Sequence, residues 1–195
     1  VSYLTSSNLC AVTGTFDVTI TDDEDGTFTY ASAEYCVSGS DPTPTVTGTT
    51  GGTFSSTAGL SINASTGEID LSASTAGTYT VSYLTSSNTC AVTGTFDVTI
   101  TDDEDGTFTY AATEYCKSGS NPTPTVTGTT GGTFSSTAGL SINASTGEID
   151  IAASTAGTYT VSYLTSSNLC AVTGTFDVTI CLLYTSDAAD DRIGV

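Results

Sequence analysis

Apolar and polar residues alternate along several short stretches of the chain. In residues 79–83 Tyr, Val and Tyr alternate with Thr and Ser, and in residues 96–100 Phe, Val and Ile alternate with Asp and Thr. A period of two places the apolar side chains on one face, which predicts half-buried β-strands. Turn sequences rich in Gly, Pro, Asn and Thr separate these from shorter candidate strands at 28–30, 34–37, 43–47, 52–56 and 67–71.

The chain also repeats itself. The segment Val-Ser-Tyr-Leu-Thr-Ser-Ser-Asn begins at Val1, Val81 and Val161, a period of 80 residues. Residues 1–80 and 81–160 differ at seven positions, and residues 161–180 are identical to residues 1–20. A unit of this length can fold alone, whereas solenoid units need their neighbours to bury a core. About seven strands per repeat predict an all-β fold of tandem Ig-like β-sandwich domains.

The boundaries of the repeats follow from the sequence Thr-Asp-Asp-Glu-Asp-Gly at 21–26 and 101–106, a run of acids with no apolar partner. We interpret this acidic run as the linker between domains. Complete Ig-like repeats are then expected at 21–100 and 101–180. Residues 1–20 would be the C-terminal strands of a truncated repeat.

The last fifteen residues, 181–195, depart from the repeat. Where the acidic run is due, the chain reads Cys-Leu-Leu-Tyr-Thr-Ser-Asp-Ala-Ala-Asp. This string resembles a translation of the reverse complement of a common transposase sequencing adapter. We therefore expect a non-native tail on a translated metagenomic fragment, and we exclude it from reasoning about the fold.

The charge balance restricts the function. The net charge is −19, with Lys117 and Arg192 as the two cationic side chains, and His, Met and Trp are absent. This charge leaves no basic patch for nucleic acid. The sequence also has no stretch of 18 apolar residues for membrane insertion. Neither His nor a neighbouring Lys is at hand to activate a Ser nucleophile, so we predict that this is not an enzyme.

Six cysteines suggest disulfides, because neither Cys-x-x-Cys nor His is present to favour a metal site. The acidic-run boundaries predict the pairs Cys36–Cys90 and Cys116–Cys170, each within one repeat. The alternative pairs, Cys10–Cys36 and Cys90–Cys116, would each cross an acidic run. In the first arrangement the partner of Cys10 is unidentified. Disulfides of either kind predict an oxidising location outside the cytoplasm.

Two segments carry a family resemblance. Ala-Gly-Leu-Ser-Ile-Asn-Ala-Ser-Thr-Gly-Glu-Ile at 58–69 and Ala-Gly-Thr-Tyr-Thr-Val-Ser-Tyr at 76–83 resemble the bacterial Ig-like or cadherin-like module. Tyr-Cys-x-Ser-Gly-Ser-x-Pro-Thr-Pro, beginning at Tyr35 and Tyr115, is similar to tandem repeats of large secreted, adhesin-type surface proteins. The buried Trp of antibody domains is absent. The resemblance implies an adhesive or stalk role and transfers no catalytic residue.

The acidic runs are candidate metal sites. Clustered carboxylates suit Ca²⁺, which takes six to eight oxygen ligands. We therefore consider Ca²⁺ at the domain junctions as a possible cofactor, although an acidic linker that is simply solvated and extended by charge repulsion is the alternative. The candidate ligands are Asp22, Asp23, Glu24, Asp25, Asp102, Asp103, Glu104 and Asp105.

These observations predict the structural and adhesive repeat region of an extracellular bacterial surface protein, acting as an extended stalk. Its partners would be neighbouring Ig-like repeats of the same chain, with glycan or a host or cell surface engaged by domains outside this sequence. Two alternatives remain open at this point. One is a spacer in a secreted polysaccharide-degrading enzyme, and the other is a calcium-dependent binding module.

Overall fold

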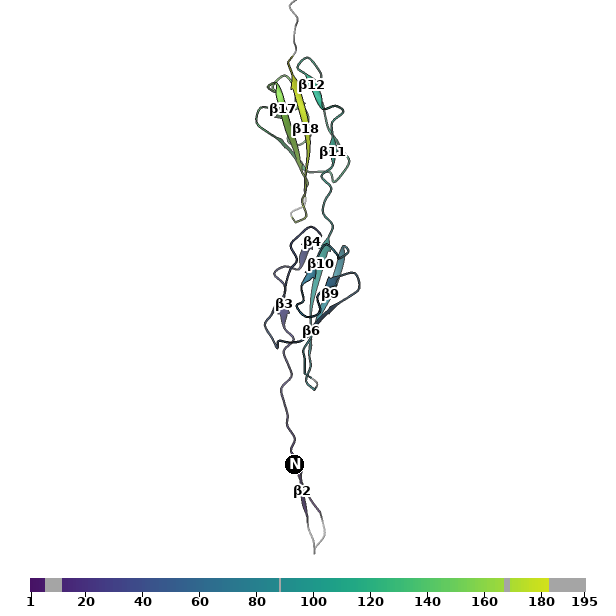
Figure 1. Cartoon of the computed structure of the whole chain (residues 1–195), viewed down its shortest axis with the longest axis vertical. Helices are drawn as coiled ribbons and strands as arrows, with labels where there is room; N and C mark the ends of the chain where they lie inside the picture. Colours follow the sequence, from purple (N-terminus) through teal and green to yellow (C-terminus); the bar gives the residue numbers. More distant parts are fainter. Residues whose placement is uncertain (6–11, 88, 167–168, 183–195) are drawn as a thin grey trace, which may run out of the picture. The chain divides into compact units, whose positions relative to one another are not determined.

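The computed structural model describes residues 1–5, 12–87, 89–166 and 169–182 (Figure 1). Cys10 and most of the predicted tail, residues 183–195, lie outside the described residues. The chain divides into two compact units. Unit 1 comprises Val1–Glu34 and Ser40–Thr99, and unit 2 comprises Tyr35–Gly39 and the chain from Ile100 onward. A short segment of the first repeat therefore belongs to unit 2.

All regular structure in the described residues is β-structure, which confirms the predicted all-β class. The first repeat contains β3 (Phe28–Thr29), β4 (Glu34–Cys36), β5 (Thr45–Val46), β6 (Thr53–Ser56), β7 (Ser61–Ile62), β8 (Ile69–Asp70), β9 (Gly77–Leu84) and β10 (Thr93–Thr101). The second contains β11 (Phe108–Thr109), β12 (Glu114–Cys116), β13 (Thr125–Val126), β14 (Thr133–Ser136), β15 (Ser141–Ile142), β16 (Ile149–Asp150), β17 (Gly157–Leu164) and β18 (Thr173–Cys181). The sequence pattern missed β7 and its equivalent β15.

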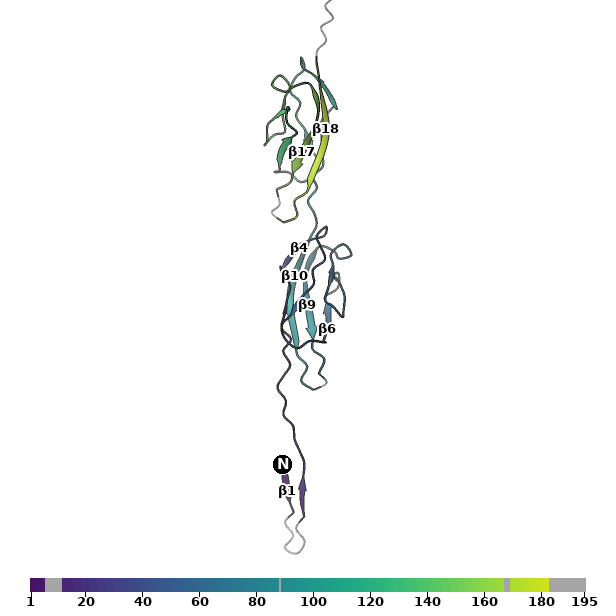
Figure 2. The same cartoon turned by 60° about the vertical axis from the view of Figure 1, so that its left-hand side comes forward.

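The strands of each repeat form an Ig-like β-sandwich. One layer is a four-stranded sheet, with the order β4-β10-β9-β6 in the first repeat and β12-β18-β17-β14 in the second (Figure 2). The pairs β3-β5 and β7-β8, and their equivalents β11-β13 and β15-β16, complete the repeats. The long strands β17 and β18 are antiparallel from Gly157↔Ile180 to Leu164↔Thr173, whereas β12 runs parallel to β18.

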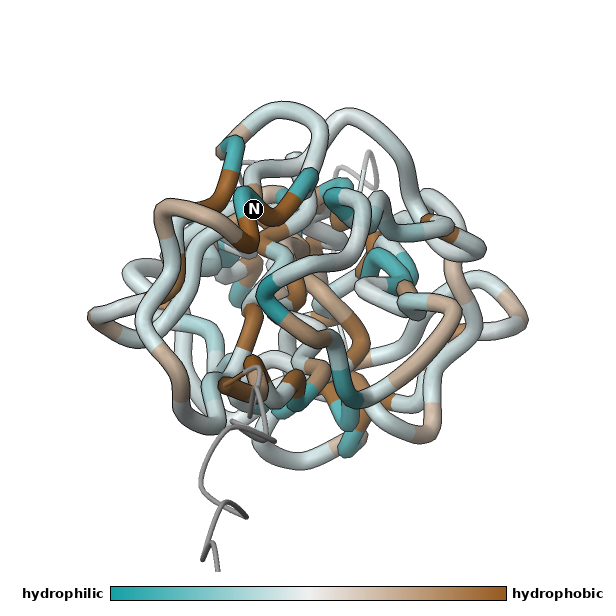
Figure 3. Tube along the Cα trace, turned by 90° about the horizontal axis from the view of Figure 1, so that it is seen from above, coloured by the Kyte–Doolittle hydropathy of each residue, from teal (hydrophilic) through white to brown (hydrophobic). Residues whose placement is uncertain are grey.

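The core follows the alternation in the sequence. On β9 the buried residues are Tyr79, Val81 and Tyr83, and on β10 they are Val98 and Ile100. In Figure 3 the apolar positions, in brown, lie mostly on the inner part of the trace, while the outer loops are pale. The second repeat buries the equivalent set, which is Phe108, Tyr110, Phe134, Leu140, Ile149, Ile151, Tyr159, Val161, Tyr163, Val178 and Ile180.

Buried tyrosines keep their hydroxyl groups paired. The Tyr83 hydroxyl donates to the Thr49 carbonyl oxygen (2.8 Å) and accepts from the Gly52 N–H (2.9 Å). The Tyr110 hydroxyl donates to the Gly147 carbonyl oxygen. Burial, with a smaller contribution from Tyr115, raises the pKa of Tyr110 above its usual range. The Tyr110 phenol is therefore a neutral donor, and the hydrogen bonds of both tyrosines tie loops to the core.

The N-terminal strands β1 (Ser2–Leu4) and β2 (Thr13–Thr15) form a separate antiparallel pair in unit 1. Their register, Ser2↔Thr15, Tyr3↔Gly14 and Leu4↔Thr13, reproduces that of the equivalent residues on β17 and β18. Their side chains, however, are exposed. Within the part of the chain that the structure describes, no helix is long and apolar enough to cross a membrane.

Candidate functional site at the acidic runs and the cysteines

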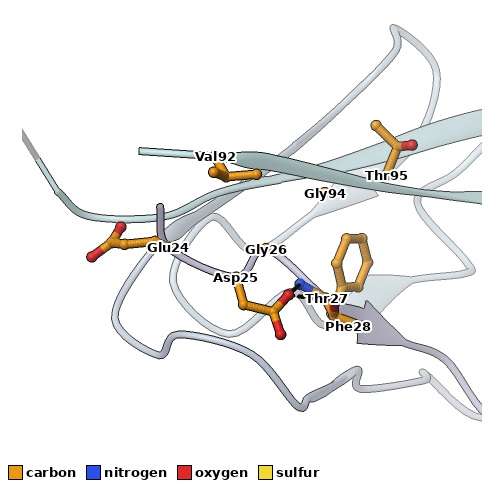
Figure 4. Close-up of a pocket in the computed structure, with 8 residues that line it drawn as sticks. All are labelled: Glu24, Asp25, Gly26, Thr27, Phe28, Val92, Gly94 and Thr95. Carbon is orange, nitrogen blue, oxygen red and sulfur yellow. Dashed lines mark hydrogen bonds between the residues drawn. The ribbon is translucent and has the colours of Figure 1, made fainter. Parts of the chain in front are cut away.

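Each acidic run ends where two glycine backbones touch. A Cβ atom on Gly94 would lie 1.9 Å from the Gly26 carbonyl oxygen, and one on Gly26 would lie 2.7 Å from the Gly94 nitrogen. Gly106 and Gly174 make the same approach in unit 2. Because only glycine permits this contact, the end of the run is fixed against β10 or β18. Figure 4 shows Gly26 beside Gly94 in unit 1.

The last carboxylate of each run organises its own turn. An Asp25 Oδ1 atom accepts hydrogen bonds from the Thr27 N–H (2.9 Å) and from the Thr27 hydroxyl. The hydroxyl bond, followed by the backbone bond, lowers the pKa of Asp25 below its usual 3.8. Asp105 repeats this arrangement with Thr107, and its pKa is lowered for the same reason. These two carboxylates therefore shape the turn, as Asx motifs do.

The other carboxylates of the runs point to different partners. Glu24 Oε2 accepts a hydrogen bond from the Ser87 N–H at 3.0 Å. Figure 4 shows the Glu24 side chain directed away from that of Asp25. In unit 2, Asp103 Oδ1 accepts from the Ser38 hydroxyl at 2.9 Å. Asp22, Asp23 and Asp102 are exposed.

The structure therefore does not gather the predicted calcium ligands into one cluster. Among the described residues, no three carboxylates of either run have oxygens within 4.8 Å of one another. A calcium ion would have to draw these side chains together. Calcium binding stays a prediction.

A cavity lies beside the end of each run. In unit 1 it measures about 280 Å³ and is lined by Glu24, Asp25, Gly26, Thr27, Phe28, Val92, Gly94 and Thr95 (Figure 4). In unit 2 the equivalent residues line a cavity of about 330 Å³. The lining combines two acidic residues and two threonines with one Phe and one Val. Sequence reasoning missed these cavities, because their two walls are some 65 residues apart in the chain.

The structure corrects the predicted disulfide pairing. Cys36 is bonded to Cys170, with an S–S distance of 2.05 Å and a sequence separation of 134 residues. None of the predicted pairs is formed: Cys36 bonds to neither Cys90 nor Cys10, and Cys116 bonds to neither Cys170 nor Cys90. Cys90 and Cys116 are free thiols, as is Cys181.

Backbone hydrogen bonds explain why these two cysteines meet. Val37, directly after Cys36, donates from its N–H to the Thr101 carbonyl oxygen at 3.0 Å. Three residues further along, the Glu104 N–H donates to the Cys170 carbonyl oxygen, also at 3.0 Å. The backbone of the acidic run at 101–106 is therefore hydrogen-bonded next to Cys36 and to Cys170, which brings the two cysteines together. The predicted pairs joined cysteines of one repeat or the two nearest cysteines across a run, whereas Cys36 and Cys170 are the outer two of the four cysteines around the run at 101–106.

Asp103 completes a small group with the disulfide. Of the described residues, Cys36, Asp103 and Cys170 are the one set of three potential metal ligands whose atoms all lie within 4.8 Å. Both sulfur atoms are already joined to each other, and thiolates rather than disulfides ligate metals. In the oxidised protein this group therefore offers only one carboxylate.

Comparisons with known proteins were made at three levels. No protein-family profile matches the chain, and no curated protein is significantly similar to it. Among solved structures, the chain is similar to a SusE-like surface-located polysaccharide-binding protein from the Bacteroides thetaiotaomicron heparin utilisation locus. The identity is 16%, the TM-score is 0.38, and the match covers 82% of this chain and 34% of that one.

Two further similar structures are cadherins. Mouse cadherin-23 EC22–24 shares 15% identity at a TM-score of 0.33, covering 83% of this chain and 65% of that one. Human protocadherin-24 EC1–2 shares 10% identity at a TM-score of 0.38, covering 83% and 99%. This chain thus spans about a third of the SusE-like protein and just under two thirds of the cadherin-23 structure. At such TM-scores the assignment of the fold rests on the strand order and core of each repeat.

Proposed function

We propose that this chain is a structural repeat region of an extracellular bacterial surface protein, in which Ig-like repeats act as an extended stalk and adhesive contacts are made elsewhere in the protein. The observation that carries the proposal is the disulfide Cys36–Cys170, which links a residue of one repeat to a residue of the next. Both cysteines lie in unit 2, so this unit is closed by a residue of the preceding repeat, as suits a protein in which the copies work as an array.

Stability and charge support the same role. Closing a loop of 134 residues stabilises the folded chain by about 5 kcal/mol on the chain-entropy model. Disulfides persist in oxidising surroundings, which supports an extracellular location. A net charge of −19 makes the repeats repel one another and favours extension over collapse.

Small-angle X-ray scattering of the oxidised chain tests the proposal. A compact globule of 195 residues would have a radius of gyration of about 16 Å, and we expect a value at least half as large again. The matched control is the double variant Cys36→Ser with Cys170→Ser, which keeps both sandwiches and removes the bond. A radius near that of the compact globule for the oxidised chain, at low and at high salt, would overturn the stalk role.

A further inference from the structure

The four cysteines of the two complete repeats occupy only two repeat positions. Cys36 and Cys116 follow Tyr in the segment Tyr-Cys-x-Ser-Gly-Ser, whereas Cys90 and Cys170 precede Ala-Val-Thr-Gly. The observed bond joins one cysteine of each kind, taken from different repeats. Cys90 and Cys116 are left over, again one of each kind, and both are free thiols.

Cys90 is held in unit 1 as bonded Cys170 is held in unit 2. The Cys90 carbonyl oxygen accepts a hydrogen bond from the Glu24 N–H at 3.1 Å, and its sulfur lies 3.9 Å from the Thr21 carbonyl oxygen. The equivalent distances at Cys170 are 3.0 and 4.0 Å. The Thr21 hydroxyl lies 3.0 Å from the Cys90 sulfur. The thiol is thus already positioned as it is in the disulfide.

Cys116 reproduces the surroundings of Cys36 in the same way. Its carbonyl oxygen accepts from the Gly119 N–H at 2.8 Å, and the Lys117 N–H donates to the Cys181 carbonyl oxygen at 3.2 Å. The equivalent distances around Cys36 are 2.9 and 3.0 Å. The difference is exposure, because bonded Cys36 is buried and Cys116 is exposed.

We propose that Cys90 and Cys116 each supply one cysteine of a disulfide equivalent to Cys36–Cys170. The other cysteine of each bond comes from a further copy of this repeat. Cys90 would bond to a cysteine equivalent to Cys36 in a copy on its N-terminal side. Cys116 would bond to one equivalent to Cys170 in a copy on its C-terminal side. One disulfide then links every pair of consecutive repeats. Each repeat contributes one cysteine to the bond with the copy before it and one to the bond with the copy after it. This inference rests on the proposed role as a tandem array.

The chemistry is thiol–disulfide exchange. The two thiols together lose two protons and two electrons as the S–S bond forms, and an external disulfide such as oxidised glutathione is reduced to two thiols. Specificity comes from position, because the flanking backbone hydrogen bonds hold both sulfur atoms near the acidic run. Cys181 occupies the place of Thr101 in register with Cys116, so tests should restore it as Cys181→Thr.

The decisive experiment adds one repeat to the full chain, by inserting a second copy of residues 101–180 after Ile180. Two matched proteins are made in which every other cysteine is Ser, except that the original Cys181, which now follows the inserted copy, is replaced by Thr. The first keeps Cys116 and the inserted copy of Cys170, and the second keeps Cys116 and the original Cys170. Both are equilibrated with a glutathione buffer, alkylated, and analysed by intact mass. We expect the equilibrium constant for oxidation to be at least about tenfold larger for the first protein. Equal or greater oxidation of the second would overturn the proposal.

A second measurement uses the chain without an insertion, so it holds even if the added repeat fails to fold. With the substitutions Cys10→Ser and Cys181→Thr, four cysteines remain. We expect oxidation to leave two free thiols, on Cys90 and Cys116, with Cys36 bonded to Cys170. Full consumption of the thiols, with bonds within each repeat, would overturn the inference. Scattering and thiol mapping are independent, so a compact chain that still forms the Cys36–Cys170 bond would disprove the stalk alone.

Discussion

Residues 1–20 and 161–180 have the same sequence but very different surroundings. Tyr3 is 73% exposed where Tyr163 is 1% exposed, and Ile20 is 91% exposed where Ile180 is 1% exposed. The strand register between the two halves of each segment is nevertheless the same. Local pattern therefore suffices to pair the two strands, whereas burial needs the other strands of the repeat.

The packing of Tyr163 shows what those strands contribute. Its ring lies 4.6 Å from that of Phe134 on β14 and 5.9 Å from that of Phe108 on β11, measured between ring centroids. Its hydroxyl donates to the Thr129 carbonyl oxygen and accepts from the Gly132 N–H. These partners precede Tyr163 in the chain by 29 to 55 residues. Burial of Tyr163 therefore depends on strands that come earlier in its own repeat.

Truncating the same Tyr in the two segments should produce the largest difference. Tyr163→Ala removes a buried ring and two hydrogen bonds, so we expect the free energy of unfolding of unit 2 to fall by about 3–5 kcal/mol. Tyr3→Ala, the matched control, should change the free energy of unfolding of unit 1 by less than about 0.5 kcal/mol. Urea unfolding followed by tyrosine fluorescence measures both. Similar losses for both variants would mean that residues 1–20 are packed in solution.

Removing the disulfide should have the next largest effect. Cys36→Ser with Cys170→Ser releases the cross-link, and we expect a loss of about 2–5 kcal/mol in the oxidised protein. Cys90→Ser sits at the same repeat position as Cys170→Ser but breaks no bond, so its effect should be small. Differential scanning calorimetry of the oxidised variants makes the comparison. A loss for Cys90→Ser as large as that for the double variant would contradict the observed pairing.

Glycine at one repeat position gives a third contrast. A Cβ atom on Gly174 would lie 1.9 Å from the Gly106 carbonyl oxygen, while at the equivalent Gly14 no atom lies within 4 Å among the described residues. Gly174→Ala must push two backbones apart, at a cost of about 1–3 kcal/mol. Gly14→Ala should be close to neutral. Thermal unfolding distinguishes them, and equal melting temperatures would show that the acidic run is not fixed against β18.

The turn carboxylates predict a pH dependence with a defined sign. Hydrogen bonds from Thr107 and Thr27 lower the folded-state pKa values of Asp105 and Asp25 below 3.8. Their contribution to stability is therefore complete above the unfolded-state pKa and is lost as the pH falls through the lower folded-state value. We expect melting temperatures to drop below about pH 4, and less steeply in Asp25→Asn with Asp105→Asn. Parallel curves for the variant and the parent chain would remove these two groups as the cause.

Calcium should give the smallest effect. For a dissociation constant of about 0.1–1 mM, which is typical of extracellular modules, 1 mM Ca²⁺ would add about 0.4–1.4 kcal/mol, or a few degrees in melting temperature. The variant Asp22→Asn with Asp23→Asn, and its equivalent at 102 and 103, should abolish the shift. The same melting temperature with Ca²⁺ and with chelator would exclude a site of this affinity in either acidic run.

Much of the fold could be predicted from the sequence, and the candidate site only in part. Alternation in residues 79–83 and 96–100 defined the two long strands and their buried faces, because the β pleat has a period of two. The short strands β7 and β15 carry no such pattern. The acidic runs were visible as candidates, but their actual partners, among them Thr27, Ser87 and Ser38, could not be deduced from linear spacing.

The sequence by itself determined the repeat, the β-rich class, the negative charge and the alternation that makes each half-buried strand. Those features depend on neighbouring residues or on composition. The tertiary structure alone decided that Cys36 bonds to Cys170, that Gly94 touches Gly26, and that Tyr163 and Ile180 are buried while the equivalent Tyr3 and Ile20 are exposed. Each of these depends on which distant segments the fold brings together. Identical repeats offer several equally spaced partners, so distance in the sequence cannot choose among them.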